Sequence, residues 1–224
     1  MRKILFYITV YAEKSSIEIT NTLYSNVMYD VGACCGSLDA CLHAYCLLPT
    51  SFHALFDLDP AQLNQLASAL QKLWRRLISS DTRDTSDCAL MRVCPVEKNR
   101  FAYDLSLYIH SLPLFCGIVI DTAEYRFSSF DAYCHIQKNQ SVDTGKILSL
   151  VTSGSIPGFK TRRYHSDLME FTARKWLHLN VYSSSQCFGS LVFRRFVKSY
   201  MRSFGCERYG QEIVMPFCRD QREQ

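Results

Sequence analysis

The sequence predicts an α+β fold: a ferredoxin-like antiparallel sheet with helices on one face, followed by a C-terminal helical extension. Two observations predict it. Residues 3–112 follow the order strand, helix, strand, strand, helix, strand, helix, which contains the βαββαβ order of ferredoxin-like domains. Beyond residue 129 the strand-like patterns give way to helix-like segments. We therefore expect a sheet-containing domain over residues 1–130 and a basic helical extension over residues 131–224.

The first strand is expected over residues 3–11, where apolar side chains fill two alternating faces. One face holds Ile4, Phe6, Ile8 and Val10, and the other holds Leu5, Tyr7, Thr9 and Tyr11. A helix follows, with Thr20 or Asn21 as its N-cap. Gly32 and Gly36 are expected to end that helix.

Two paired strands are expected over Leu42–Leu48 and Phe52–Leu58, because both runs are continuously apolar and Pro49-Thr50-Ser51 lies between them. Asp59-Pro60 then opens a helix, with proline near its first turn. The apolar face of that helix is marked by leucines at helical spacing, namely Leu63, Leu66, Leu70, Leu73 and Leu77.

The last elements of the predicted domain are a strand at Cys88–Val96 and a helix at Asn99–Leu112, which Pro113 is expected to stop. One broad face of this helix is apolar and holds Phe101, Leu105, Tyr108, Ile109 and Leu112. Three further helices are expected in the extension, over residues 143–151, 161–176 and 184–204.

Composition is that of an ordinary globular chain, with 48% hydrophobic and 21% charged residues. No stretch approaches the ~20 apolar residues that span a bilayer, so no membrane partner is expected. The chain starts with a short, alternating, aromatic run that favours a strand over a secretory signal. These features lead us to expect a cytoplasmic protein.

The eleven cysteines are an odd number and include no CxxC pair. This spacing does not favour an unrelated cysteine-rich metal-binding protein, and it predicts reduced, mostly buried thiols. The formal net charge of +4 permits nucleic-acid binding without arguing for it. The positive charge is concentrated in residues 160–208, which makes the extension the electropositive part of the chain.

Two short segments carry a resemblance to a known family. They are His43–Phe56, HAYCLLPTSFHALF, and Tyr108–Phe130, YIHSLPLFCGIVIDTAEYRFSSF. In this order they resemble the REP-associated tyrosine transposases, insertion-sequence transposase-like members of the single-tyrosine, His-hydrophobic-His (HUH) enzymes. The matching positions are Pro49, His53, Tyr108, Ile109, His110, Pro113, Gly117, Val119, Ser128 and Ser129. The segments VDTGKILSL, TRRYHSDLMEF and GSLVFRRF extend the resemblance into the C-terminal part.

The resemblance implies a fold of the expected class and a tyrosine-dependent cleavage of single-stranded DNA. Tyr108 stands at the nucleophile position, from which the tyrosine oxygen would attack a phosphodiester and form a covalent phosphotyrosine bond. A divalent cation, Mg or Mn, would polarise the scissile phosphate. His53 stands at the second metal-binding histidine, but Ser51 and Leu112 occupy the other two ligand positions. Neither replaces an imidazole or an amide, so the metal site is degenerate.

Two other histidines are candidates to replace the missing metal ligands. His110 lies two residues from Tyr108, about 200° around a helix, and therefore points away from it. His43 begins the preceding strand, and its orientation relative to His53 is not fixed by the sequence. Either would complete the metal site only by rearrangement.

The basic extension is the candidate DNA-binding part. Its candidate phosphate-contacting residues are Arg162, Arg163, Arg194, Arg195 and Lys198. Aromatic residues interleave with them and would stack on bases, or else form a packed core beneath a solvated basic face. These aromatic residues are Tyr164, Phe171, Trp176, Phe193, Phe196 and Tyr200.

The expected function is that of a transposase-like protein that acts on hairpin-forming single-stranded DNA, as a monomer or homodimer, with impaired metal-dependent cleavage. The alternative is a catalytically inactive descendant that binds DNA or a protein partner for regulation. Ser51, His53 and Leu112 discriminate between the two, because they decide whether Mg or Mn binds.

Overall fold

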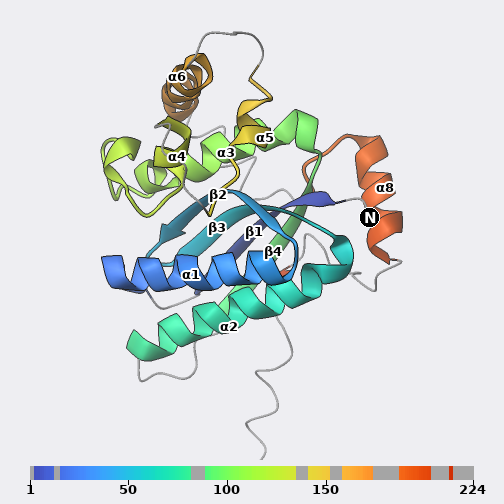
Figure 1. Ribbon diagram of the computed structural model, residues 1–224, viewed down its shortest axis with the longest axis horizontal. Helices are drawn as coiled ribbons and strands as arrows, with labels where there is room; N and C mark the ends of the chain where they lie inside the picture. The colour runs from blue at the N-terminus through green and yellow to red at the C-terminus, as the bar shows by residue number, and fades with distance from the viewer. Residues whose placement is uncertain are drawn as a thin grey trace, which may run out of the picture.

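The structure is a computed structural model that describes residues 3–12, 16–81, 89–134, 141–151, 158–173, 187–202 and 212–213. The described elements follow one another along the chain and are shown in Figure 1. They are β1 (Ile4–Ala12), α1 (Asn21–Ser37), β2 (Cys41–Leu48), β3 (Ser51–Leu58), the 3₁₀ turn η1 (Pro60–Gln62), α2 (Leu63–Asp81), β4 (Ala89–Val96), α3 (Lys98–Phe115), the 3₁₀ turn η2 (Thr122–Glu124), α4 (Phe130–Cys134), α5 (Gly145–Leu148), α6 (Phe159–Ala173), α8 (Leu191–Arg202) and β5 (Glu212–Ile213).

The strands form one antiparallel sheet in the order β2-β3-β1-β4-β5. Its first four strands have the spatial order 2-3-1-4 that a βαββαβ chain adopts in a ferredoxin-like domain. The α+β class predicted from the sequence is therefore confirmed. β1 lies between β3 and β4, so its side chains reach the centre of both faces of the sheet.

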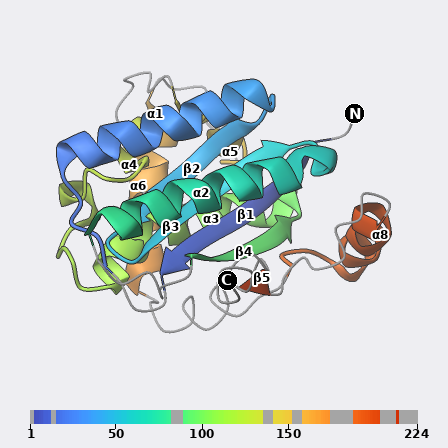
Figure 2. The ribbon, with the colours of Figure 1, turned by 90° about the horizontal axis from the view of Figure 1, so that it is seen from below.

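Helices cover both faces of the sheet, which corrects the expectation that they lie on one face. The crossover helices α1 and α2 pack on the face that carries Phe6 and Phe56. α3 packs on the opposite face, with Leu5 and Leu55, and α4, α5 and α6 lie on the same side. Figure 1 shows the two helical layers on opposite sides of the sheet, and Figure 2 shows α1 and α2 in front of it. The reason is that β1 and β3 are apolar on both faces, and each face needs a cover.

Helix boundaries depart from expectation at glycine and proline. Thr20 caps α1 as expected, because its hydroxyl accepts a hydrogen bond from Leu23 N at 3.2 Å. α1 nevertheless runs through Gly32 and Gly36 to Ser37, because burial of its apolar side outweighs the low helix propensity of glycine. Likewise α3 includes Pro113 in its last turn.

The segment after α3 covers the free edge of the sheet. Leu47 N donates to Phe127 O at 2.9 Å, and Ser129 N donates to Tyr45 O at 3.0 Å. These bonds pair residues 127–129 with β2, the edge strand, so its backbone groups have partners inside the protein. The serine pair Ser128-Ser129, part of the family-like segment, therefore has a structural role at this edge.

The described part of the extension is helical, although its helices are shorter than expected. Trp176 and the ends of the two longest predicted helices lie outside the described residues. α5 and α6 contribute Ile147, Tyr164 and Leu168 to the core beneath α3. The division at residues 130 and 131 stays a prediction. Within the described residues, no helix has both the length and the apolar character needed to cross a membrane.

Candidate functional site

A group of polar side chains lies beneath α3 on the neighbouring strands β1 and β3. Tyr7 and Thr9 project from β1, and Ser51 and His53 project from β3. Thr9 is the cross-strand partner of His53, so both face the same side. Tyr108 reaches this region from α3 and meets the Tyr7 ring edge-on, at a centroid separation of 6.4 Å. The structure therefore brings His53 and Tyr108 to one face of the sheet.

Both ring nitrogens of His53 are already hydrogen-bonded. Nδ1 lies 2.7 Å from the Tyr7 hydroxyl and 3.4 Å from the Thr9 hydroxyl, and Nε2 lies 2.9 Å from the Ser51 hydroxyl. The Tyr7 ring also stacks on the imidazole at 6.0 Å. Desolvation by these neighbours lowers the pKa of His53 to about 3. His53 is therefore a neutral ring at physiological pH, held by hydroxyls alone.

Tyr108 is buried, with only 3% of its surface exposed. Burial raises its pKa to about 12, with a smaller contribution from the Cys116 thiol, whereas the positive charge of Arg92 opposes the shift. Each unit of pKa changes the phenolate fraction tenfold, so Tyr108 holds roughly 100-fold less phenolate at neutral pH than an ordinary tyrosine. In this conformation Tyr108 is a poor nucleophile.

The residues around His53 do not fit Mg or Mn. Such cations require several oxygen or imidazole ligands, and Ser51 offers one neutral hydroxyl that already bonds His53. Leu112 is 4% exposed and packs in the same apolar cluster as Tyr108, and its hydrocarbon side chain cannot bind a cation. A single imidazole remains, and no metal-dependent step follows from this arrangement.

His110 serves the core and lies away from Tyr108, as its helix position predicts. Its Nδ1 lies 2.7 Å from the Tyr164 hydroxyl and its Nε2 lies 2.7 Å from the Ser129 hydroxyl. The Tyr164 hydroxyl in turn donates to Ser106 at 3.0 Å. This network ties α3 to α6 and to the segment that covers β2. Burial lowers the pKa of His110 to about 3, which keeps it neutral.

His43 belongs to a second polar cluster at the other end of the same sheet face. It is fully buried, and its Nε2 lies 3.7 Å from Asp57 Oδ2. Lys98 and Lys146 contact the same Asp57 oxygen at 2.8 and 3.3 Å. Asp57 lies four residues beyond His53 on β3, a separation of ~13 Å along a strand. His43 therefore does not complete the metal site at His53.

The pKa values of this second cluster follow from its ion pairs. Burial disfavours the charged forms of both His43 and Asp57, but their mutual contact opposes that effect. The pKa of His43 is raised to about 9, and the lysines help to hold the pKa of Asp57 well below its usual range. The sequence offered no signal for Asp57 beyond an acidic residue in an apolar strand.

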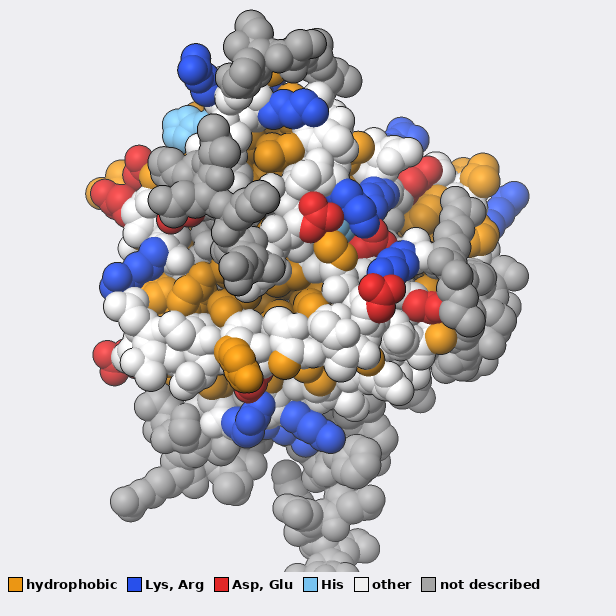
Figure 3. Space-filling model, in the orientation of Figure 1, with side chains coloured by type: hydrophobic (Ala, Val, Ile, Leu, Met, Phe, Trp, Pro, Cys, Tyr) orange, Lys and Arg blue, Asp and Glu red, His pale blue; other side chains and the backbone are white. Residues whose placement is uncertain are grey.

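The candidate DNA-binding residues are all exposed but do not form one surface. Arg162 and Arg163 lie on α6, and Arg194, Arg195 and Lys198 lie on α8. Figures 1 and 2 place these two helices at opposite sides of the molecule. On the face in Figure 3, Lys and Arg side chains are scattered among Asp and Glu. The predicted basic set is therefore divided between two sites.

The aromatic residues of α6 support the structural interpretation of that helix. Tyr164 and Phe171 are buried in the core beneath α3. Arg163 forms an ion pair with Asp167 at 2.8 Å, which offsets part of the charge on this helix. α8 differs, because it exposes Leu191, Val192 and Phe196 beside its cations. Of these two helices, α8 therefore exposes three large apolar side chains, whereas α6 exposes only Met169 among its described large apolar residues.

Tyr7 is the site residue that sequence reasoning missed. Its ring lies between His53 and Tyr108 and contacts both. The strand alternation placed Tyr7 and Thr9 on one face, but which face would meet Tyr108 depended on where α3 packs. That packing became visible only in the folded chain.

Comparison with known proteins yields a distant structural likeness. No family model matches the sequence, and no curated protein matches it. Among solved structures, the chain is similar to one described as "Structure of the REP associates tyrosine transposase bound to a REP hairpin". The TM-score is 0.48 at 14% identity, over 59% of this chain and 79% of that chain. At this distance a functional argument has to come from the residues of the site.

Proposed function

We propose that this chain is a transposase-like protein that binds hairpin-forming single-stranded DNA and whose tyrosine strand-cleavage site is impaired. The observation that carries the proposal is the arrangement of His53 and Tyr108. These two residues, the expected nucleophile and a metal ligand of the family pattern, both contact Tyr7 on one side of the sheet.

The same arrangement supports loss of efficient cleavage. Phosphodiester attack by tyrosine requires an accessible, ionisable hydroxyl and a positive charge on the phosphate. Tyr108 is buried, its pKa is raised to about 12, and the three candidate metal ligands are reduced to His53. Cleavage in this chain therefore needs both a rearrangement of Tyr108 and a cation from elsewhere.

α8 is the part of the described chain best suited to contact DNA. Arg195 and Lys198 are exposed and three residues apart, so they lie on one side of the helix. Leu191, Val192 and Phe196 are exposed beside them. Cations that bind phosphates next to apolar groups that meet bases are the features of a single-strand binding surface.

Arg194 has an additional structural role. Its Nε donates to Gly189 O at 2.9 Å, which fastens the side chain to the start of α8. Replacing Arg194 would therefore disturb the helix as well as remove a charge. Arg195→Ala with Lys198→Ala is the cleaner test of phosphate contacts.

The test is fluorescence anisotropy with a labelled DNA hairpin that carries a single-stranded tail, measured over a range of salt concentrations. We expect the double variant to weaken binding and to flatten the plot of log K against log salt by about 1.4, since each contact to a single strand contributes about 0.7. A matched control is Lys72→Ala with Arg76→Ala, which removes the same charge from α2.

Two results would count against the proposal. One is the absence of hairpin binding by the wild-type chain at low salt. The other is an equal loss of affinity in the α8 and α2 double variants, which would mean that the change in net charge alone explains the weaker binding. Selective weakening by the α8 pair would locate the DNA contact on that helix.

A further inference from the structure

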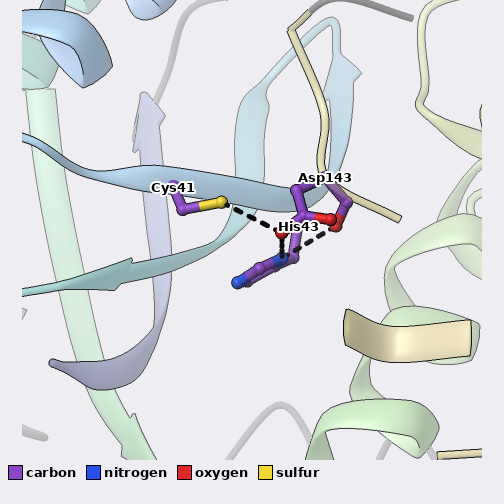
Figure 4. Close-up of side chains that lie close together, drawn as sticks. All are labelled: Cys41, His43 and Asp143. Carbon is purple, nitrogen blue, oxygen red and sulfur yellow. Dashed lines mark hydrogen bonds and ion pairs between the residues drawn. The ribbon is translucent and has the colours of Figure 1, made fainter. Parts of the chain in front are cut away.

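We infer that Cys41, His43 and Asp143 form a binding site for Zn²⁺ at the edge of the sheet. Cys41 and His43 project from β2, and Asp143 comes from the segment before α5 (Figure 4). One ligand atom from each residue, a thiol sulfur, a ring nitrogen and a carboxylate oxygen, lies within 4.8 Å of the other two. This site is distinct from the one at His53 and does not depend on the proposed DNA-binding function.

The spacing of the three atoms is close to that of a tetrahedral zinc site. Zinc bonds of roughly 2.0–2.3 Å place neighbouring ligand atoms ~3.3–3.7 Å apart. Cys41 Sγ lies 3.6 Å from Asp143 Oδ2, and His43 Nδ1 lies 4.0 Å from the same oxygen. The first separation already matches a tetrahedral site, and His43 Nδ1 must move closer to the carboxylate and give up its bond to Asp143 O to reach it.

The backbone already holds these residues in place. Asp143 N donates to Leu42 O at 2.9 Å, which fixes Asp143 against β2. β2 has a bulge between Leu42 and Ala44, so His43 is the extra residue on its strand. Such a bulge redirects a side chain relative to the regular alternation. Asp143 Oδ1 accepts from Gly145 N at 3.0 Å, which leaves Oδ2 to face Cys41 and His43.

A second, independent observation concerns the other nitrogen of His43. Nε2 is buried and has no hydrogen-bond partner, although Asp57 Oδ2 lies 3.7 Å away. Metal-binding histidines usually donate their second N–H to a carboxylate, which fixes the ring. With Nδ1 on the ion, Nε2–H of His43 would point at Asp57. The carboxylate that such a site requires is therefore already present.

The charges and donor types select the cation. A Cys41 thiolate and the Asp143 carboxylate together neutralise a divalent ion, while the charge of Asp57 is already paired with Lys98 and Lys146. A thiolate and an imidazole favour a borderline cation such as Zn²⁺ over Mg²⁺, which prefers oxygen ligands. Cys41 and Asp143 are partly exposed, so the fourth position opens to water.

Zinc binding requires the loss of a proton from two of the ligand atoms. His43 Nδ1 now donates to Asp143 O at 2.8 Å, and Cys41 holds its thiol proton. Both protons leave to solvent as the nitrogen and sulfur bind the ion. The ion then connects β2 to the start of α5, and we expect it to raise the melting temperature of the protein.

The test is titration of the chelator-treated full chain with Co²⁺, whose thiolate charge-transfer and visible bands report a tetrahedral site with a cysteine ligand. We expect one equivalent to bind with these bands and Zn²⁺ to displace it. Cys41→Ser should abolish the charge-transfer band, and Asp143→Asn should weaken binding at least tenfold. Cys34→Ser on α1 is the matched control and should behave as the wild type does.

Asp57→Asn tests the carboxylate behind His43 and should weaken Co²⁺ binding ten- to 100-fold. Circular dichroism checks that each variant folds. The inference would be overturned if the wild type gave no thiolate–cobalt band, or if Cys41→Ser retained the band of the wild type. Equal losses in Cys41→Ser and Cys34→Ser would likewise reject Cys41 as the specific ligand.

Discussion

Replacing His110 should change how stability depends on pH. The ring is fully buried among Tyr133, Tyr164 and Ser129, and burial lowers its pKa from 6.5 to about 3. Burial also raises the pKa values of both tyrosines, so they stay neutral. Between pH 6.5 and 3, His110 is therefore protonated in the unfolded chain but stays neutral in the folded chain.

The sign and size follow from that difference in bound protons. Stability from His110 is complete above pH 6.5 and is lost as the pH falls towards 3. Between pH 8 and pH 5 the free energy of unfolding falls by about 2 kcal/mol. The reason is that pH 5 lies about 1.5 units below the unfolded pKa, and each unit corresponds to roughly 1.4 kcal/mol. His110→Gln removes this contribution, so its free energy of unfolding should fall less steeply over that range.

The assay is urea denaturation of wild type and His110→Gln at intervals from pH 8 to pH 5. The difference between the two slopes isolates His110, whatever the absolute stability of the variant. His165→Gln controls for the loss of one exposed histidine. Parallel curves for wild type and His110→Gln would refute the reasoning, because they would mean that His110 accepts a proton equally in both states.

Two further predictions concern packing and charge. In a chelator-containing buffer, Asp57→Asn should lower the free energy of unfolding by about 2 kcal/mol, because it removes the buried carboxylate that Lys98 and Lys146 contact. Chemical denaturation measures this loss, and an unchanged denaturation midpoint would contradict the prediction. Gly189→Ala should weaken hairpin binding by disturbing α8, since a Cβ there would lie 2.1 Å from the Phe193 ring. Fluorescence anisotropy measures the affinity and circular dichroism checks the fold, and an affinity equal to that of the wild type would argue against the prediction.

The order of the elements could be predicted from the sequence because local signals agree with the fold. The alternation in β1, the Thr20 cap and the paired apolar runs around Pro49 each specify structure within a few residues. The face covered by α3 could not be predicted, since β1 is apolar on both sides.

Only part of the candidate site could likewise be predicted from the sequence. His53 and Tyr108 were found from short motifs, whereas Tyr7 depended on where α3 packs. Asp143 lies 100 residues from His43, and the bulge that turns His43 towards it leaves no mark in the sequence. Spacing rules for cysteine pairs therefore missed a cluster that only the tertiary fold assembles.

Restoring the metal ligands would test whether the site at His53 is an impaired strand-transfer site. Ser51→His places a second imidazole beside His53 on the same face of β3, and Leu112→Asn replaces hydrocarbon by an amide near Tyr108. Because Leu112 is 4% exposed, its replacement should cost about 3 kcal/mol, so folding of the double variant is verified first by circular dichroism.

The most direct measurement is the yield of covalent protein–DNA adduct on a denaturing gel, with a labelled single-stranded hairpin and Mn²⁺. The account predicts no adduct for the wild type. It predicts an adduct for Ser51→His with Leu112→Asn, because the double variant restores two ligands and also removes apolar packing around Tyr108, and the adduct should disappear when Tyr108→Phe is added. A Mn²⁺-dependent adduct formed by the unmodified chain would contradict the claim that the metal site is impaired, and an adduct that survives Tyr108→Phe would remove Tyr108 as the nucleophile.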